Sequence, residues 1–149
     1  MDPNTLGMQD YLAMELLTQP KTEYLLDASL ESLHVESVEW LKEIDFWSDE
    51  ITFFYKLLKR SNDARDYPGR ELAIIEKKLI SVNSDQVSKV RSDILQHERA
   101  LAGVLQSAYL LEEDRYREKH RQLLMDIYSI HKVIRSLKKE VFSFIQKHE

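Results

Sequence analysis

Apolar residues follow a repeating pattern over most of this chain. Between Leu30 and Leu58 they recur at alternating steps of four and three, the heptad spacing of helices that pack side by side. A second row, repeating every seven residues, widens this apolar stripe, so we expect two or more partner helices. The first row is Leu30, His34, Ser37, Leu41, Ile44, Ser48, Ile51, Tyr55 and Leu58, and the second is Leu33, Trp40, Trp47 and Phe54.

The same spacing predicts two further long helices. One starts near Gly69, and residues 81–88 interrupt it with side chains that prefer caps and turns, so we expect a local underwinding or a break there. Its apolar row is Leu72, Ile75, Leu79, Val82, Val90, Ile94, His97, Leu101, Val104 and Ala108. The other carries Tyr116, His120, Leu123, Ile127, Ile130, Ile134, Leu137, Val141 and Phe144.

Turn residues place the connections between these helices. Asp27 or Ser29 can cap the first helix, with Thr22 as an alternative start, and residues 61–69 end it. The second turn is inferred between Gly103 and Asp114, where acidic residues suit a helix N-terminus. We predict an all-α, antiparallel up-down-up bundle of three long helices, at about 27–60, 70–107 and 113–147, in one domain spanning 1–149.

Two features lie outside this pattern. Residues 1–21 form an apolar segment between Pro3 and Pro20 that we interpret as a short N-terminal helix or arm. The rear face of the first helix carries Phe46, Phe53 and Leu57, away from the predicted seam. Because exposed apolar patches are uncommon on soluble monomers, we favour the arm as their cover, and a docking face for a partner or a second copy is the alternative.

Composition narrows the function classes. The chain has 149 residues, 43% hydrophobic and 32% charged, with a net charge of -5. This is typical of a folded protein and gives no basic footprint for nucleic acid. Cysteine is absent, which excludes disulfides and thiolate ligands. Asp10 and Glu15 interrupt the only early apolar stretch, and no apolar run is long enough to span a bilayer, so we expect a cytoplasmic protein without membrane contact.

Three histidines occupy predicted seam positions on three different helices. In antiparallel helices, residues at one level are equally distant from the turn between them. The midpoint of His34 and His97 falls in the first connection, and that of His97 and His120 falls in the inferred second one. We therefore expect His34, His97 and His120 to lie in one layer of the bundle.

Such a layer has two interpretations. Three neutral imidazoles suit a divalent transition metal such as zinc, with Glu31 and Asp93, one turn away, as extra ligands or hydrogen-bond acceptors. The Glu-x-x-His motif of bundle metal sites occurs only once, as Glu31 to His34, and no His-Glu-x-x-His motif is present. The favoured interpretation is therefore a polar layer that sets the helix register without any cofactor.

No motif for catalysis emerges, since phosphate loops and nucleophile elbows are missing and acidic pairs on long helices are usually solvated. The strings Leu33-His34, Glu39-Trp40-Leu41, Asp49-Glu50-Ile51 and Gln96-His97-Glu98 are similar to small bacterial helical-bundle proteins that are uncharacterised, which implies the fold but no activity. We expect a non-enzymatic interaction or scaffold protein that binds a protein partner or itself. A metal-binding bundle is the alternative.

Overall fold

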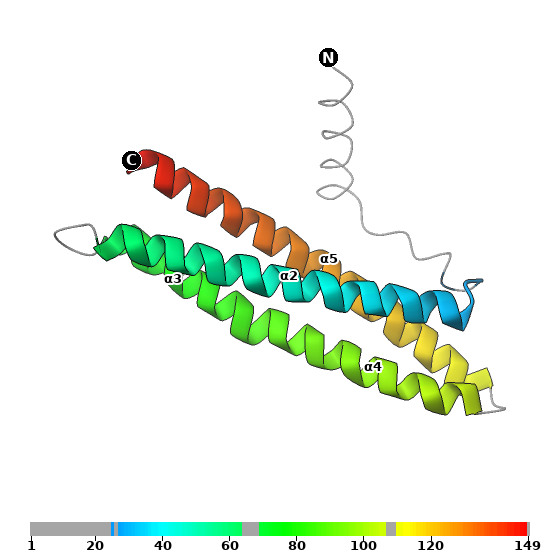
Figure 1. The fold of residues 1–149 in the computed structure, drawn as a ribbon. Helices are drawn as coiled ribbons and strands as arrows, with labels where there is room; N and C mark the ends of the chain where they lie inside the picture. Colours follow the sequence, from blue (N-terminus) through cyan, green and yellow to red (C-terminus); the bar gives the residue numbers. More distant parts are fainter. Residues whose placement is uncertain (1–24, 26, 64–68, 107–109, 149) are drawn as a thin grey trace, which may run out of the picture.

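The computed structural model describes residue 25 and residues 27–63, 69–106 and 110–148 (Figure 1). Its elements are α2 (Leu30–Asp63), α3 (Arg70–Ser81), the π-helix η2 (Val82–Val87), α4 (Ser88–Gln106) and α5 (Leu110–Lys147). All of them are helices, so the all-α prediction is confirmed. The helix limits differ from the predicted ones by at most three residues. The predicted arm, residues 1–21, lies outside the described residues.

Contacts between the helices give their relative directions. Residue numbers rise along α2 while they fall along its contacts on α4 and η2: His34 with Glu98, Asp45 with Arg91 and Ser48 with Asn83. The same holds between the α3–α4 rod and α5: Glu71 with Lys147, Lys78 with Glu140 and His97 with His120. Each of these contacts pairs a low residue number on one rod with a high number on its neighbour, and Figure 1 shows the rods side by side.

Helix α2 begins at a serine cap. The backbone N–H of Ser32 donates to Ser29 Oγ at 3.1 Å, which satisfies one of the amides that a helix N-terminus leaves without a partner. Of the predicted starts, the structure thus uses Ser29 rather than Asp27.

The buried face of α2 corrects the predicted seam. His34 is exposed, and Leu41, Ser48 and Tyr55 are only partly buried. The predicted and observed rows share four positions. They differ at the others because the structure buries bulky aromatic side chains, whose burial removes the most apolar area from water. The buried row is Leu33, Ser37, Trp40, Ile44, Trp47, Ile51, Phe54 and Leu58.

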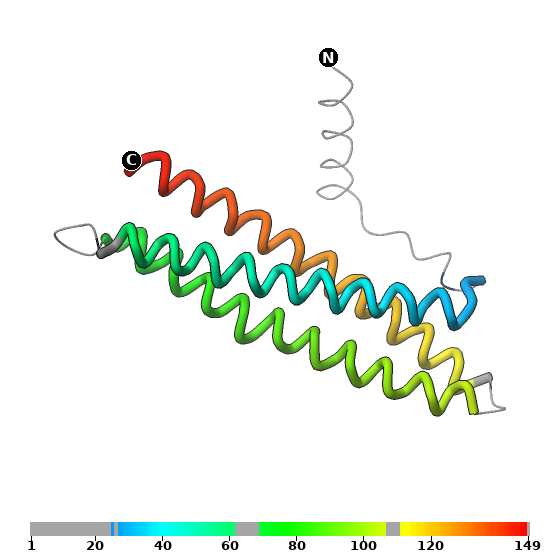
Figure 2. The backbone as a smooth tube through the Cα atoms, viewed as in Figure 1, coloured from blue at the N-terminus to red at the C-terminus, as the bar shows by residue number. Residues whose placement is uncertain are grey.

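Helices α3, η2 and α4 form one continuous rod (Figure 2). Its buried positions step by three and four except between Val82 and Val87, where the step is five. A π-helix bonds residue i to i+5, so it takes in one extra residue without turning the apolar face away. Ser88 donates to the Asn83 carbonyl through both its N–H and its hydroxyl. The rod is therefore underwound at 82–87 and unbroken.

The predicted apolar row of α5 is buried along its whole length.

The buried residues form two apolar clusters. The large cluster holds twenty buried residues and extends from Trp40, Ile94 and Leu123 to the far end of the helices. The small cluster consists of Leu25, Leu33, Leu101, Val104 and Tyr116. Among the described helices, none combines the length and apolar content needed to cross a lipid bilayer.

Candidate functional site

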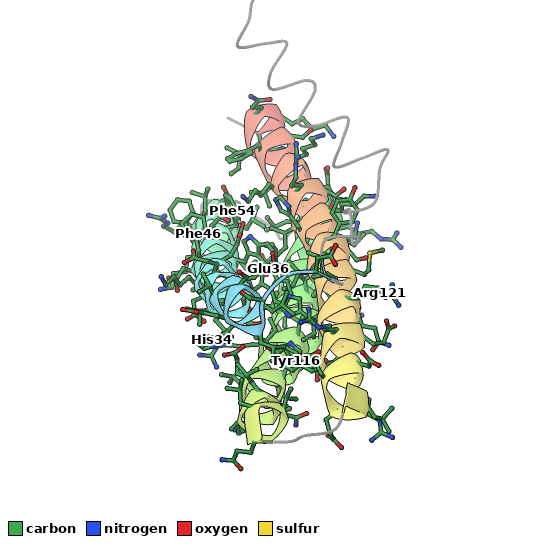
Figure 3. All side chains as sticks on the ribbon, turned by 90° about the vertical axis from the view of Figure 1, so that its right-hand side faces the viewer. His34, Glu36, Phe46, Phe54, Tyr116 and Arg121 are labelled. Carbon is green, nitrogen blue, oxygen red and sulfur yellow. The ribbon has the colours of Figure 1, made fainter. Side chains whose placement is uncertain are left out.

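A chain of hydrogen bonds separates the two clusters. His97 Nε2 on α4 lies 3.0 Å from His120 Nδ1 on α5, and His120 Nε2 lies 2.7 Å from Glu36 Oε1 on α2. His97 is 3% exposed and His120 is fully buried. Figure 3 shows Glu36 between the helices. We call Glu36, Ser37, His97 and His120 the histidine layer.

Aromatic rings enclose both imidazoles. Trp40 stacks on His120 with a centroid distance of 4.4 Å, and Tyr116 stacks on His97 at 4.1 Å, almost parallel at 10°. These rings belong to the apolar rows of α2 and α5, so the heptad pattern itself positions them. The imidazoles are thus buried without losing the packing that the core requires.

The hydrogen-bond partners determine which ring nitrogens donate in the layer. A carboxylate only accepts, so His120 Nε2 carries a hydrogen and His120 Nδ1 is free to accept. In that arrangement His97 Nε2 donates to His120 Nδ1. Burial lowers the pKa of His97 to about 4, and repulsion from His120 and Lys119 acts in the same direction. The buried ring of His97 is therefore neutral at pH 7.

Two hydroxyls in this region are poorly satisfied. The Tyr116 hydroxyl faces that of Ser37, but neither makes a hydrogen bond of ordinary geometry within the described residues. Burial, followed by the charge of Glu98, raises the pKa of Tyr116 to about 12. A buried hydroxyl without a good partner costs stability, so this part of the layer is a weak point in the fold.

His34 lies at the expected level of the bundle but outside the layer. Its side chain is 47% exposed, and its Nδ1 pairs with a Glu98 carboxylate oxygen on α4. The layer is occupied from α2 by Glu36, because the buried face of α2 is rotated from the predicted one. The sequence therefore brings together His97 and His120 and leaves His34 at the rim.

The other predicted ligands also lie apart from the layer. Glu31 is exposed at the start of α2, and Asp93 pairs with Lys89 on its own helix at 2.8 Å. Within the part of the chain that the structure describes, no group of three or more His, Cys, Asp or Glu side chains is arranged to hold a metal ion. His97 Nε2 and His120 Nδ1 face each other at 3.0 Å.

Sequence reasoning missed the part that Glu36 plays. Its signal is the spacing to Trp40: a residue four positions before the bulkiest side chain of the stripe points to nearly the same side of the helix. Weighting the apolar row by side-chain size would have placed Glu36, rather than His34, beside the two histidines.

The predicted rear face of α2 is exposed among the described residues. Phe46 is 60% exposed and Phe53 is 54% exposed, while Leu57 is partly buried. Phe46 projects at the outer side of α2 in Figure 3. Phe53 contacts the buried Phe54 edge-on, and Phe54 contacts the exposed Phe142 of α5, so the aromatic surface continues toward α5. We call Phe46, Phe53 and Leu57 the phenylalanine face.

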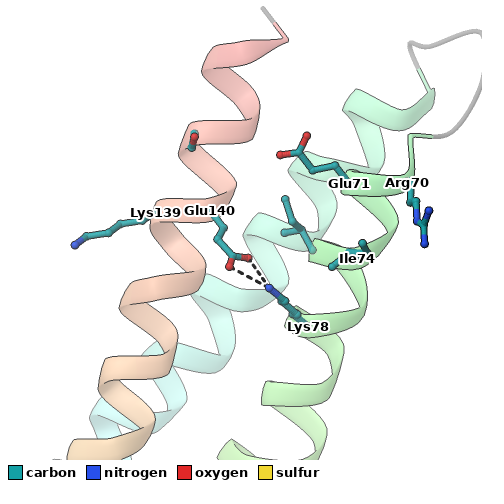
Figure 4. A pocket seen from close by; sticks show the side chains of 8 residues that line it. Arg70, Glu71, Ile74, Lys78, Lys139 and Glu140 are labelled. Atoms are coloured by element: carbon teal, nitrogen blue, oxygen red, sulfur yellow. Dashed lines mark hydrogen bonds and ion pairs between the residues drawn. The ribbon is translucent and has the colours of Figure 1, made fainter.

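The surface clefts show no comparable chemistry. A cleft of about 630 Å³ lies between α3 and α5, and the ion pair between Lys78 and Glu140 bridges it at 3.1 Å (Figure 4). A smaller one of about 240 Å³ opens between α4 and α5 beside His97 and Tyr116. Their charged side chains are mostly those of a solvated helix surface, and no nucleophile with an adjacent base lines either cleft.

Comparisons of the chain with protein-family models, with curated proteins and with solved structures find no match. The histidine layer and the phenylalanine face are thus the two features of the fold that suggest a function.

Proposed function

We propose that this chain is a non-enzymatic protein-interaction bundle that docks a protein through the phenylalanine face. The proposal rests on one observation. Two phenylalanines on one side of α2 are more than half exposed, whereas the opposite side of the same helix carries the buried row. A solvated phenylalanine contributes little to folding. Burying one fully against a partner stabilises a complex by about 1.5–3 kcal/mol.

The arrangement suits docking on a rigid surface. In the proposed up-down-up bundle, α2 is held along its length by the large cluster, so Phe46 and Phe53 are presented at fixed spacing two turns apart. A preformed helix face loses little conformational entropy on binding. The N-terminal segment, residues 1–24, is the alternative cover for this face.

A pair of serine variants tests the proposal. Immobilised wild-type chain and the Phe46→Ser/Phe53→Ser variant are incubated with an extract of the cells that make the protein. We expect a protein that the wild type retains, that the variant loses, and that binds again when purified. The matched control, Ile74→Ser/Ile80→Ser, removes two exposed apolar side chains from α3 and should retain it. Equal retention by all three chains contradicts the proposal.

A second candidate, metal binding, has one observation in its favour. His97 Nε2 and His120 Nδ1 point at each other, and Glu36 accepts from the far nitrogen of His120, as a carboxylate does behind a metal-bound histidine. In a three-histidine site for a metal such as zinc, His34 would have to leave its pairing with Glu98 at the rim and turn toward His97 and His120. The site then serves binding, since the layer holds no further acid or nucleophile in a cleft.

Elemental analysis separates the two candidates. Protein is purified without chelators or a nickel column, and its metal content is measured for wild type and for His97→Ala. A stoichiometric metal that the variant loses supports a metal-binding bundle. No bound metal, together with no rise in melting temperature on adding zinc, contradicts it.

A further inference from the structure

The outer side of α2 carries a second heptad row, opposite the buried one. Its members recur at alternating steps of four and three, so they form one stripe along the helix, and every one is exposed. The two phenylalanines are at its centre, and charged residues lie on both sides. The row is Val35, Glu39, Lys42, Phe46, Asp49, Phe53, Lys56 and Arg60.

Charge is distributed unequally along this side of α2. Glu39 and Glu43 precede the phenylalanines, whereas Lys56 and Arg60 follow them. Lys42 lies within the acidic part and pairs with Glu39 at 3.3 Å. An exposed ion pair of this kind contributes little and exchanges readily. The stripe is therefore acidic toward its N-terminal end, aromatic in the middle and basic toward its C-terminal end.

We infer that the phenylalanine face binds a second copy of this chain, with the two α2 helices antiparallel. This deepens the proposed function by naming the partner. With the two-fold axis between residues 49 and 50, Phe46 of one copy lies level with Phe53 of the other. The same register sets Glu39 against Arg60 and Glu43 against Lys56. The surface is thus complementary to itself, as a two-fold interface requires.

Other arrangements fit the charges less well. Two parallel α2 helices oppose acid to acid and base to base along the whole stripe. The N-terminal segment, residues 1–24, carries four acidic residues and one basic one, so it matches only the basic part of the stripe. At the centre of the antiparallel pair the two exposed Asp49 side chains lie beside each other, a like-charge contact that lowers the affinity, while the charge of the neighbouring Glu50 is balanced by Lys138 at 2.7 Å.

The contact is small. From Glu39 to Arg60 the stripe is about 32 Å long, and two helices meeting along that length bury less than the roughly 1,200 Å² of a stable interface. The dimer is therefore weak and exchanging. Salt weakens it, because the pairs that set its register are exposed.

Complementary charge reversal tests the inference. Sedimentation of the full chain over a range of concentrations gives the dissociation constant. Glu39→Lys/Glu43→Lys and Lys56→Glu/Arg60→Glu should each weaken self-association tenfold or more, and an equimolar mixture of the two variants should restore it. Lys77→Glu/Arg99→Glu, a reversal on α3 and α4, should leave the constant unchanged. A wild type that is monomeric at every concentration, or a mixture that fails to associate, overturns the inference.

Cysteine variants test the direction of the helices, since the chain has no native cysteine. Asp49→Cys lies beside its own equivalent in the antiparallel pair and should form an intermolecular disulfide on oxidation. Val35→Cys lies about 43 Å from its equivalent and should not. The reverse result overturns the antiparallel register. The wild type could instead be monomeric and retain a different protein that the serine variant does not retain. The partner would then not be a second copy, and the docking function would stand.

Discussion

The two apolar clusters on either side of the histidine layer differ in how they are held. The large cluster joins all three rods through twenty buried side chains. The small cluster has five, and Leu25 is fixed to it by Arg117, which donates to the carbonyls of Leu25 and Ala28 at 2.7 Å each. Local opening begins where few apolar contacts cross. The small cluster should therefore open first, and the histidine layer is the boundary between the two stabilities.

Shortening a side chain in the large cluster has the largest expected effect. Ile44→Ala should lower the free energy of unfolding by about 3 kcal/mol, because it removes fully buried methyl groups and leaves a cavity. Urea unfolding measures the change. The control Val35→Ala, at an exposed position of the same helix, should stay within about 0.5 kcal/mol of wild type. Equal losses at the two positions would contradict the observed rotation of α2.

Acidification should loosen the boundary itself. Burial lowers the pKa of His97 to about 4 in the native state, below the ordinary histidine pKa of 6.5, so the unfolded chain binds the proton more readily. The stabilising contribution is complete above about pH 6.5 and is lost as the pH falls toward 4, by up to about 3 kcal/mol. Burial also lowers the pKa of His131, which acts in the same direction.

Amide hydrogen exchange at pH 7 and pH 5 measures where this loss appears. Residues 29–36 and 98–104, at the small cluster, should gain exchange before residues 44–58. In His97→Gln, which does not titrate, the pH dependence should be shallower. Uniform opening of the whole molecule would show that the layer is no boundary.

Removing the charge of Glu36 should have a moderate effect. Glu36→Gln weakens the hydrogen bond to the fully buried His120 and should cost about 1 kcal/mol, read from urea unfolding. Glu39→Gln, one turn further along and exposed, is the matched control and should be nearly neutral. A neutral Glu36→Gln would mean that the ring of His120 does not depend on this acceptor.

The smallest expected effect has the opposite sign. Tyr116→Phe keeps the stack on His97 and removes a buried hydroxyl without a good partner, so it should raise the free energy of unfolding by about 0.5–1 kcal/mol. Tyr55→Phe, at a partly buried hydroxyl of α2, should not stabilise. A loss of stability in Tyr116→Phe would show that the hydroxyl makes a useful hydrogen bond.

The sequence predicts position along the helices better than rotation about them. His34 lies next to Glu98, close to the level predicted from the position of the turn. It lies on the exposed side of α2, however, and not on the buried one. The level of a residue along the bundle depends on the position of the turn, and turn-forming residues in the sequence indicate that position. Rotation depends on which of two overlapping heptad rows is buried, and this was decided by the size of Trp40 and Trp47, which counting apolar positions ignores.

The sequence was enough to predict that Phe46 and Phe53 lie away from the core. It was not enough to predict which residue of α2 lies beside His97 and His120. Both phenylalanines lie far from either heptad row, so their placement did not depend on choosing between the rows. The hydrogen bond between His120 and Glu36 was missed despite the spacing of Glu36 to Trp40, because a single acidic residue within a helix usually lies at a solvated surface.

The π-helix at Val82–Val87 has a consequence for how the rod tolerates a change in length. If one residue were removed between Val82 and Val87, every later buried position would continue the three-and-four rhythm of Leu72 to Val82 without interruption. The widened turn thus absorbs one extra residue, and the buried positions after it keep their orientation. Deleting Ser84 should restore a regular helix and leave the bundle assembled.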